Sequence, residues 1–166
     1  MSVASLPASV PPDFLTALQT LASLERLDLE DMKLMILLET AGDPLYQRLA
    51  DLAPNQEAAD LLRQNGREET AHAHRLKAAI EILTGDSYAI PELADNPYAT
   101  PPAFPTLSPE LLEGVAGAEA NGDAMYQRYA DNEPDPRVAE LLRQNGREEA
   151  RHGERVARVI EILRTA

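Results

Sequence analysis

The stretch "LLRQNGREETAHAHR" (residues 61–75) recurs eighty residues later as "LLRQNGREEARHGER" (residues 141–155). When residues 39–83 are aligned with residues 119–163, 25 of the 45 pairs are identical, far more than chance would give. The chain is therefore an internal duplication. Both copies keep a Glu-x-x-His spacing, and this repeated element decides how the rest of the sequence is interpreted.

Each half of the repeat predicts a helical hairpin. A first helix is followed by a short break, "LAPNQ" (52–56) or "NEPDP" (132–136), and then by a longer helix that runs to "IEIL". Leu, Ala, Glu and Arg are frequent and Trp is absent, which favours helix over sheet. We expect Pro54 and Pro134 at the helix starts, where the missing backbone N–H costs nothing.

The segment between the two halves is rich in proline, which excludes both a helix and a central strand there. A connection of about 22 residues can return along a helix of about 28 residues, a distance of roughly 42 Å. The sequence therefore predicts four helices with one long crossover. We predict a single all-α domain over 1–166, with an N-terminal extension carrying a short helix (1–27), a first hairpin (28–84), a Pro-rich crossover (85–107) and a second hairpin (108–166).

Steps of four and three residues along each predicted helix identify the side chains that face inward. In the longer helix of each half this stripe is apolar except at its middle, where a Glu and a His interrupt it. In the first helix of each half the same count places one Glu inward. The six candidate metal ligands are Glu39, Glu69, His72, Glu119, Glu149 and His152.

Four carboxylates in one core would each cost several kcal/mol if they were buried, ionised and alone. Two divalent cations would balance the four negative charges, and two neutral imidazoles would complete the ligand set. Carboxylate with imidazole suits iron or manganese better than calcium, and the chain has no cysteine to supply thiolate. The alternative is that these residues are partly exposed and paired with Arg67, Arg75, Arg147 and Arg155. The doubled pattern favours the metal site.

The composition excludes other classes. A net charge of -13 argues against nucleic acid as a partner, because phosphate binding needs clustered Lys and Arg. The N-terminal stretch "MSVASLPASVPPDF" has no signal-peptide pattern, and no apolar run is long enough for a membrane helix. We therefore expect a soluble, cytoplasmic protein with no membrane partner.

The doubled pattern, in which a Glu precedes each Glu-x-x-His by thirty residues, resembles the ferritin-like di-iron carboxylate proteins, in particular the rubrerythrin and bacterioferritin branch. The resemblance covers about residues 28 to 165. It implies a ferritin-like four-helix bundle that holds two iron ions, with manganese as a second candidate. In that family pattern Glu39 and Glu119 are terminal ligands, Glu69 and Glu149 bridge the metals, and each His completes one metal.

The same resemblance implies ferrous iron oxidation, or reduction of peroxide or dioxygen with an unidentified electron donor, and makes a homodimer plausible. Two departures bear on this choice. Rubrerythrins usually carry a further Glu where this chain has Gly122, and many have an iron domain held by four Cys, which this chain lacks. Because the chain ends shortly after the second "IEIL", a large storage shell is not expected. The alternative is an iron-sequestering or partner-binding protein with a structural, redox-silent metal site.

Residues beside the six candidates form pairs related by the repeat. Glu68 and its counterpart are expected to be solvated or paired with Arg, and Asp43 and its counterpart to be exposed. Asn65 and its counterpart either hold carboxylates in place or fix the helix register. For Tyr46 and its counterpart we favour a core aromatic over a contact with a ligand. His74 is expected on the surface.

Overall fold

The computed structural model describes residues 5–165, and that part of the chain is helical with no β-strand. The predicted all-α class is therefore confirmed. Four of the helices are long, α1 is short, and η1 is a single 3-10 turn. The elements are α1 (Phe14–Ala22), α2 (Leu29–Asp51), α3 (Gln56–Thr84), η1 (Leu93–Asp95), α4 (Pro109–Asp131) and α5 (Pro136–Thr165).

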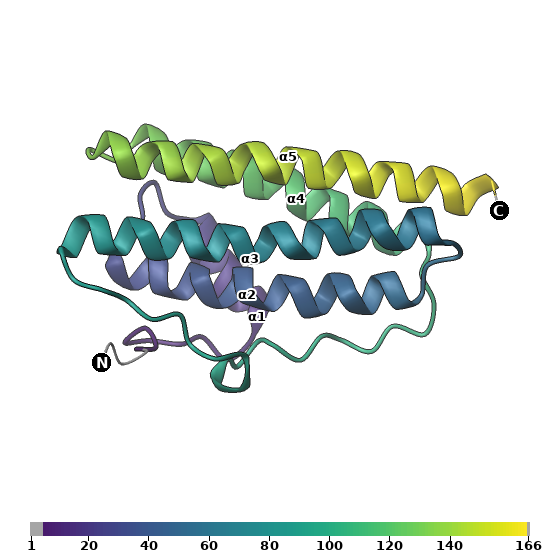
Figure 1. Ribbon diagram of the computed structural model, residues 1–166, viewed down its shortest axis with the longest axis horizontal. Helices are drawn as coiled ribbons and strands as arrows, with labels where there is room; N and C mark the ends of the chain where they lie inside the picture. The colour runs from purple at the N-terminus through teal and green to yellow at the C-terminus, as the bar shows by residue number, and fades with distance from the viewer. Residues whose placement is uncertain (1–4, 166) are drawn as a thin grey trace.

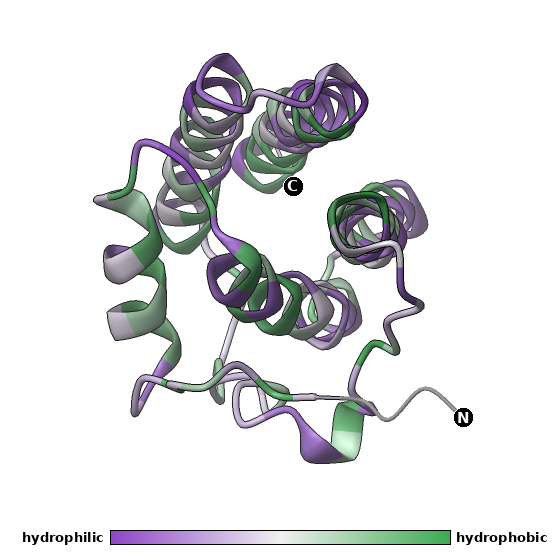
Figure 2. Cartoon of the chain, turned by 90° about the vertical axis from the view of Figure 1, so that its left-hand side faces the viewer, coloured by the Kyte–Doolittle hydropathy of each residue, from purple (hydrophilic) through white to green (hydrophobic). Residues whose placement is uncertain are grey.

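The long helices pack as two hairpins. Helix α2 lies against α3, α4 lies against α5, and the hairpins meet mainly where α3 contacts α5 (Figure 1). Figure 2, which looks along the helices, shows the long helices end-on with the N-terminal segment and the connection to α4 outside them. No helix among the described residues has the length and apolar character that a membrane crossing demands.

Local sequence signals explain where the helices begin and end. Asp28 caps α2 and forms a reciprocal capping box with Asp31, while Asn55 caps α3 through the Ala58 amide. Helix α3 ends at Gly85, whose φ of 76° suits a residue without a Cβ. These caps satisfy backbone groups at the ends of helices whose centres carry the inward-facing Glu and His residues.

The predicted positions of the helix-start prolines need correction. Pro54 lies just before the cap residue Asn55, outside α3. Pro134 also lies outside its helix, and Pro136 is the first residue of α5. The Asp135 side chain, directly before α5, accepts a hydrogen bond from the Arg137 amide at 2.9 Å. Helix α2 continues through its internal Pro44.

The connection from α3 to α4 runs along the length of the long helices (Figure 1) and is anchored to α2. The Asn96 side-chain amide donates to the Leu37 carbonyl and to the Thr40 hydroxyl, both at 2.8 Å. The Tyr98 hydroxyl donates to the Pro11 carbonyl at 2.7 Å. The connection is therefore tied both to α2 and to the N-terminal extension.

Two apolar clusters fill the space between the helices. The first joins the N-terminal half of α2 to the C-terminal half of α3 and includes Met35 and Leu76. The second joins the C-terminal half of α2 to the N-terminal half of α3 and includes Leu49 and Leu62. Along α3 the stretch between these clusters contains Asn65, Glu69 and His72, which are among the polar residues that the sequence singled out.

Candidate metal centre

The structure brings all six predicted residues together at mid-height of the long helices. They are between 0 and 8% exposed. They form two groups of four residues, and within each group one donor atom per residue lies within 4.8 Å of the others. Glu69 and Glu149 belong to both groups, which is the geometry that bridging carboxylates require. The groups are Glu39, Glu69, His72 and Glu149, and Glu69, Glu119, Glu149 and His152.

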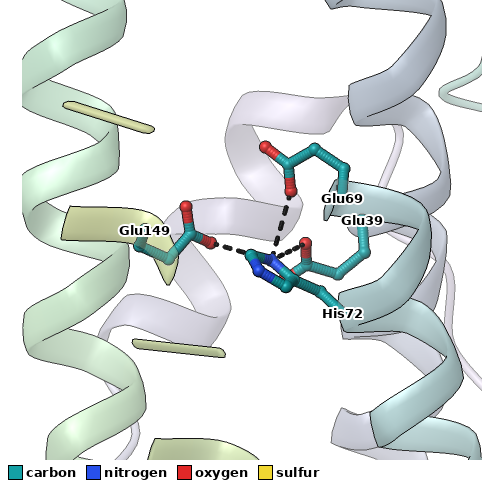
Figure 3. A group of neighbouring side chains, drawn as sticks. All are labelled: Glu39, Glu69, His72 and Glu149. Carbon is teal, nitrogen blue, oxygen red and sulfur yellow. Dashed lines mark hydrogen bonds and ion pairs between the residues drawn. The ribbon is translucent and has the colours of Figure 1, made fainter. Parts of the chain in front are cut away.

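Figure 3 shows the first group, in which three carboxylates converge on the ring of His72. Its Nδ1 lies 3.2 Å from an oxygen of Glu39, 3.4 Å from one of Glu69 and 3.5 Å from one of Glu149. Ligand atoms held about 2.1 Å from one divalent ion lie roughly 3–3.5 Å from each other. The first group therefore has the spacing of a coordination shell.

The second group repeats this arrangement. Nδ1 of His152 lies 3.4 Å from an oxygen of Glu149, 3.5 Å from one of Glu69 and 3.6 Å from one of Glu119. This Nδ1 is buried and has no hydrogen-bond partner among the described residues. Buried polar atoms are normally satisfied, so a nitrogen left facing three carboxylates fits a metal ligand. The residues present thus fit a pair of cations.

The other ring nitrogen of each histidine is held by the neighbouring hairpin. His72 Nε2 lies 3.1 Å from Glu148, and Arg75 contacts the same carboxylate through two nitrogens at 2.7 and 2.9 Å. In the related pair, His152 Nε2 lies 3.0 Å from Glu68. A carboxylate at Nε2 favours the tautomer that leaves Nδ1 free for a metal.

These outer carboxylates were only partly predicted. Their pairing with arginine is confirmed, since Arg155 binds Glu68 as Arg75 binds Glu148. Their contact with the histidines was missed, because it joins α3 to α5 and cannot be counted along one helix. The signal was present: a Glu directly before the inward Glu, with an Arg seven residues later, occurs in both copies.

The two inward asparagines hold α3 and α5 in register. Asn65 donates to the His152 carbonyl at 3.2 Å and accepts from Arg155 at 3.0 Å. Asn145 donates to the His72 carbonyl at 3.3 Å. Of the two alternatives left open by the sequence, the structure shows the fixing of register.

The buried tyrosines contact the terminal carboxylates of the opposite half. Tyr46 donates its hydroxyl hydrogen bond to Glu119, and Tyr126 donates to Glu39. Burial, and then the adjacent carboxylate, raise the pKa of both hydroxyls well above the usual value, so they remain donors at neutral pH. The prediction of core aromatics is confirmed by their burial, but the hydroxyls are satisfied by candidate metal-binding carboxylates, which is the contact that the sequence analysis did not favour.

Protons balance much of the site's negative charge in the protein without metal. The carboxylates around His152, led by Glu119, raise the pKa of its ring to about 12, although burial alone would lower that pKa. The carboxylates around His72, led by Glu39, also raise the pKa of that ring, and burial again opposes the shift. Burial and the neighbouring Glu149 raise the pKa of Glu119 well above its usual value. A cation entering the site would therefore displace protons.

Two glycines leave room for the shared carboxylates. A Cβ at position 42 would lie 2.7 Å from Cγ of Glu69, and one at position 122 would lie 3.2 Å from the carboxyl carbon of Glu149. The space at the two positions is used by the side chains of Glu69 and Glu149. A side chain at either position would push against the site.

The remaining candidates lie outside the two groups. The expectation that Asp43 and its counterpart Asp123 are exposed is wrong. Instead they are half-buried and accept hydrogen bonds from glutamine side chains four residues later, at 3.1 and 3.2 Å. His74 is exposed, as expected.

The buried set of four carboxylates and two imidazoles, with two carboxylates shared, defines a class of site that can hold two metal ions. A model of the rubrerythrin family matches residues 30–160. The chain belongs to the rubrerythrin family, whose members typically bind a pair of iron ions, and the resemblance drawn from the sequence is confirmed. Comparison with curated proteins and with solved structures finds no match.

Proposed function

We propose that this protein binds two iron ions and oxidises them from the ferrous state while reducing hydrogen peroxide or dioxygen. The observation that carries the proposal is the pair of four-residue groups that share Glu69 and Glu149. In this proposal Glu39 and His72 complete one metal site, Glu119 and His152 complete the other, and the two shared carboxylates bridge. Manganese is the second candidate metal.

Two bound ferrous ions would supply two electrons, which with two protons convert hydrogen peroxide into two water molecules, or dioxygen into hydrogen peroxide, leaving two ferric ions. The protein's own side chains would position the metal-binding groups and surround them with apolar residues. The Glu148 and Glu68 carboxylates orient the imidazole rings, and the Tyr46 and Tyr126 hydroxyls hold the terminal carboxylates. Apolar clusters flank the site on both sides along the helices.

We also propose a four-helix architecture and an external electron donor for this protein. We infer a single ferritin-like domain over 1–166, with two duplicated hairpins, 28–84 and 108–166, that form a four-helix bundle. The described part of the extension, 5–27, and the crossover, 85–107, lie outside the proposed bundle. An external donor would return electrons after each turnover, since the chain has no cysteine for an iron–sulfur relay. The strongly acidic composition argues against nucleic acid as a partner.

Anaerobic titration with ferrous iron tests the first step. We expect uptake of two ions per chain in the wild type, reduced uptake in His72→Ala, and unchanged uptake in the matched control His74→Ala on the same helix. Adding peroxide or dioxygen should then produce a ferric absorbance change that Glu69→Ala and Glu149→Ala abolish. Uptake of less than one ion per chain would contradict the proposal, and loading with many iron atoms per chain would indicate sequestration instead.

A further inference from the structure

A cavity of about 160 Å³ opens between α2 and α4 and reaches the candidate metal centre. All four carboxylates of the centre, together with Gly42 and Gly122, line it. Above them the lining is apolar and comes from α1, α2 and α4. These apolar side chains are Phe14, Leu18, Met35, Leu38, Leu45, Val115, Ala118 and Met125.

The opposite side of the centre is closed. Neither histidine lines the cavity. Their rings lie toward α3 and α5, where Glu148 with Arg75 and Glu68 with Arg155 form bidentate ion pairs across the gap. The arginine side chains are only 19 and 16% exposed. A molecule from solution therefore reaches the carboxylates most directly from the α2–α4 side.

The chemistry of the cavity selects what can enter. Among residues 5–165, the four carboxylates and the hydroxyl of Tyr46 are the only charged or hydrogen-bonding side-chain groups that line it. A hydrated cation would have to shed water against apolar walls, which costs several kcal/mol, whereas dioxygen and hydrogen peroxide carry no charge. A cavity of about 150 Å³ can hold a molecule the size of benzene, so small oxidants fit and large ones do not.

Two side chains of α1 line this cavity, although α1 belongs to the N-terminal extension and not to either hairpin. Phe14 is 40% exposed, so its ring is in contact with both solvent and the cavity lining. Leu18, one turn later, is half-buried beside it. The extension, whose role was not evident from the sequence, therefore contributes directly to the opening above the carboxylates.

We propose that the α2–α4 cavity is the passage by which a small uncharged oxidant reaches the carboxylates, and that Phe14 and Leu18 of α1 limit the size of the molecule that passes. This inference rests on the proposed function, since it concerns access to the same centre. It goes beyond that function by assigning the selection of oxidants by size to the N-terminal extension.

Xenon binding tests the passage in the metal-free protein and does not depend on activity. Crystals under xenon pressure should show xenon in the cavity of the wild type. Ala118→Phe should fill the opening and remove that xenon. The matched control Ala120→Phe changes an exposed residue of the same helix that does not line the cavity, and should keep it. Absence of xenon from the wild type would overturn the passage.

Rates of oxidation of the ferrous-loaded protein test the selectivity, with dioxygen and hydrogen peroxide as separate arms. We expect Ala118→Phe, but not Ala120→Phe, to slow oxidation by dioxygen, by hydrogen peroxide or by both several-fold at equal iron content. Phe14→Ala should raise the rate with bulky cumene hydroperoxide relative to hydrogen peroxide several-fold, while Leu15→Ala, a neighbour outside this cavity, should leave that ratio unchanged.

The outcomes separate the two proposals. Failure to bind iron would contradict the proposed function, whereas the xenon experiment would still test the passage. If iron binds and oxidises, equal rates in Ala118→Phe and Ala120→Phe would overturn the passage alone. An unchanged peroxide ratio in Phe14→Ala would overturn the role of α1 in setting the size limit.

Discussion

Tyr126, on the second hairpin, donates its hydroxyl hydrogen bond to Glu39, on the first. The reverse contact joins Tyr46 to Glu119. Each hairpin therefore holds a carboxylate of the other in place. The two halves contribute equally to the centre, and neither half holds a complete set of ligands or of supporting contacts.

Removing one of these hydroxyls should destabilise the metal-free protein. Tyr126→Phe leaves a buried carboxylate of Glu39 with one partner fewer, which we expect to cost about 1–3 kcal/mol in the free energy of unfolding. Urea denaturation of the metal-free protein measures this. Tyr98→Phe is the control, because that hydroxyl donates to a backbone carbonyl away from the centre and should cost about 1 kcal/mol. Equal costs at both positions would contradict the special role of the Tyr126 contact.

The outer carboxylates should control metal affinity. Glu148→Gln weakens the contact that orients the His72 ring, and loss of such a partner typically lowers metal affinity about 10–100-fold. Competition with a chelator measures the change. Glu140→Gln on the same helix, where the carboxylate pairs with Arg147 at the surface, should leave affinity unchanged. If both variants bind iron equally well, Glu148 does not position the ligand.

The two inner glycines should differ in their tolerance of a methyl group. Gly42→Ala places a Cβ 2.7 Å from Glu69, whereas Gly122→Ala places one 3.2 Å from Glu149. We expect the first substitution to reduce iron binding more than the second. Gly117→Ala meets no atom within 4 Å and should instead stabilise the helix by about 0.5–1 kcal/mol. Iron titration and thermal unfolding of the three variants check this order, and the reverse order for positions 42 and 122 would refute it.

Metal uptake should release protons and strengthen as the pH rises. In the metal-free protein the pKa of His152 is about 12 and that of His72 is also raised, so both rings are protonated at pH 7. A cation must displace one proton from each ring, and affinity should increase up to tenfold per pH unit for each proton released. Calorimetry in buffers of different ionisation enthalpy counts the protons. Uptake with no proton release would show that the rings are already neutral.

Much of the centre could be predicted from the sequence because the ligands follow a helical period. Glu69 and His72 fall on one stripe, and burial of the apolar residues around them fixes which way that stripe faces. Glu39 could be found only because its counterpart recurs at the same offset in the repeat. The repeat thus supplied information that a single hairpin would not contain.

The contacts between hairpins could not be predicted in the same way. Whether Glu148 meets His72 depends on how far α5 slides along α3, and the order of residues within one helix does not determine that offset. The cavity depends on where α1 lies, and its placement is set by contacts such as the one from Arg128 to the Leu24 carbonyl, which join residues more than one hundred positions apart.

The exchange of contacts between the hairpins bears on when, during synthesis, the proposed metal site becomes complete. Glu39, Glu69 and His72 leave the ribosome well before the residues that complete both groups, the last of which is His152. A nascent first hairpin offers only three of the six donors. The proposed two-metal centre would therefore need a chain translated at least to residue 152, and a prematurely truncated product would lack donors for the bridged pair.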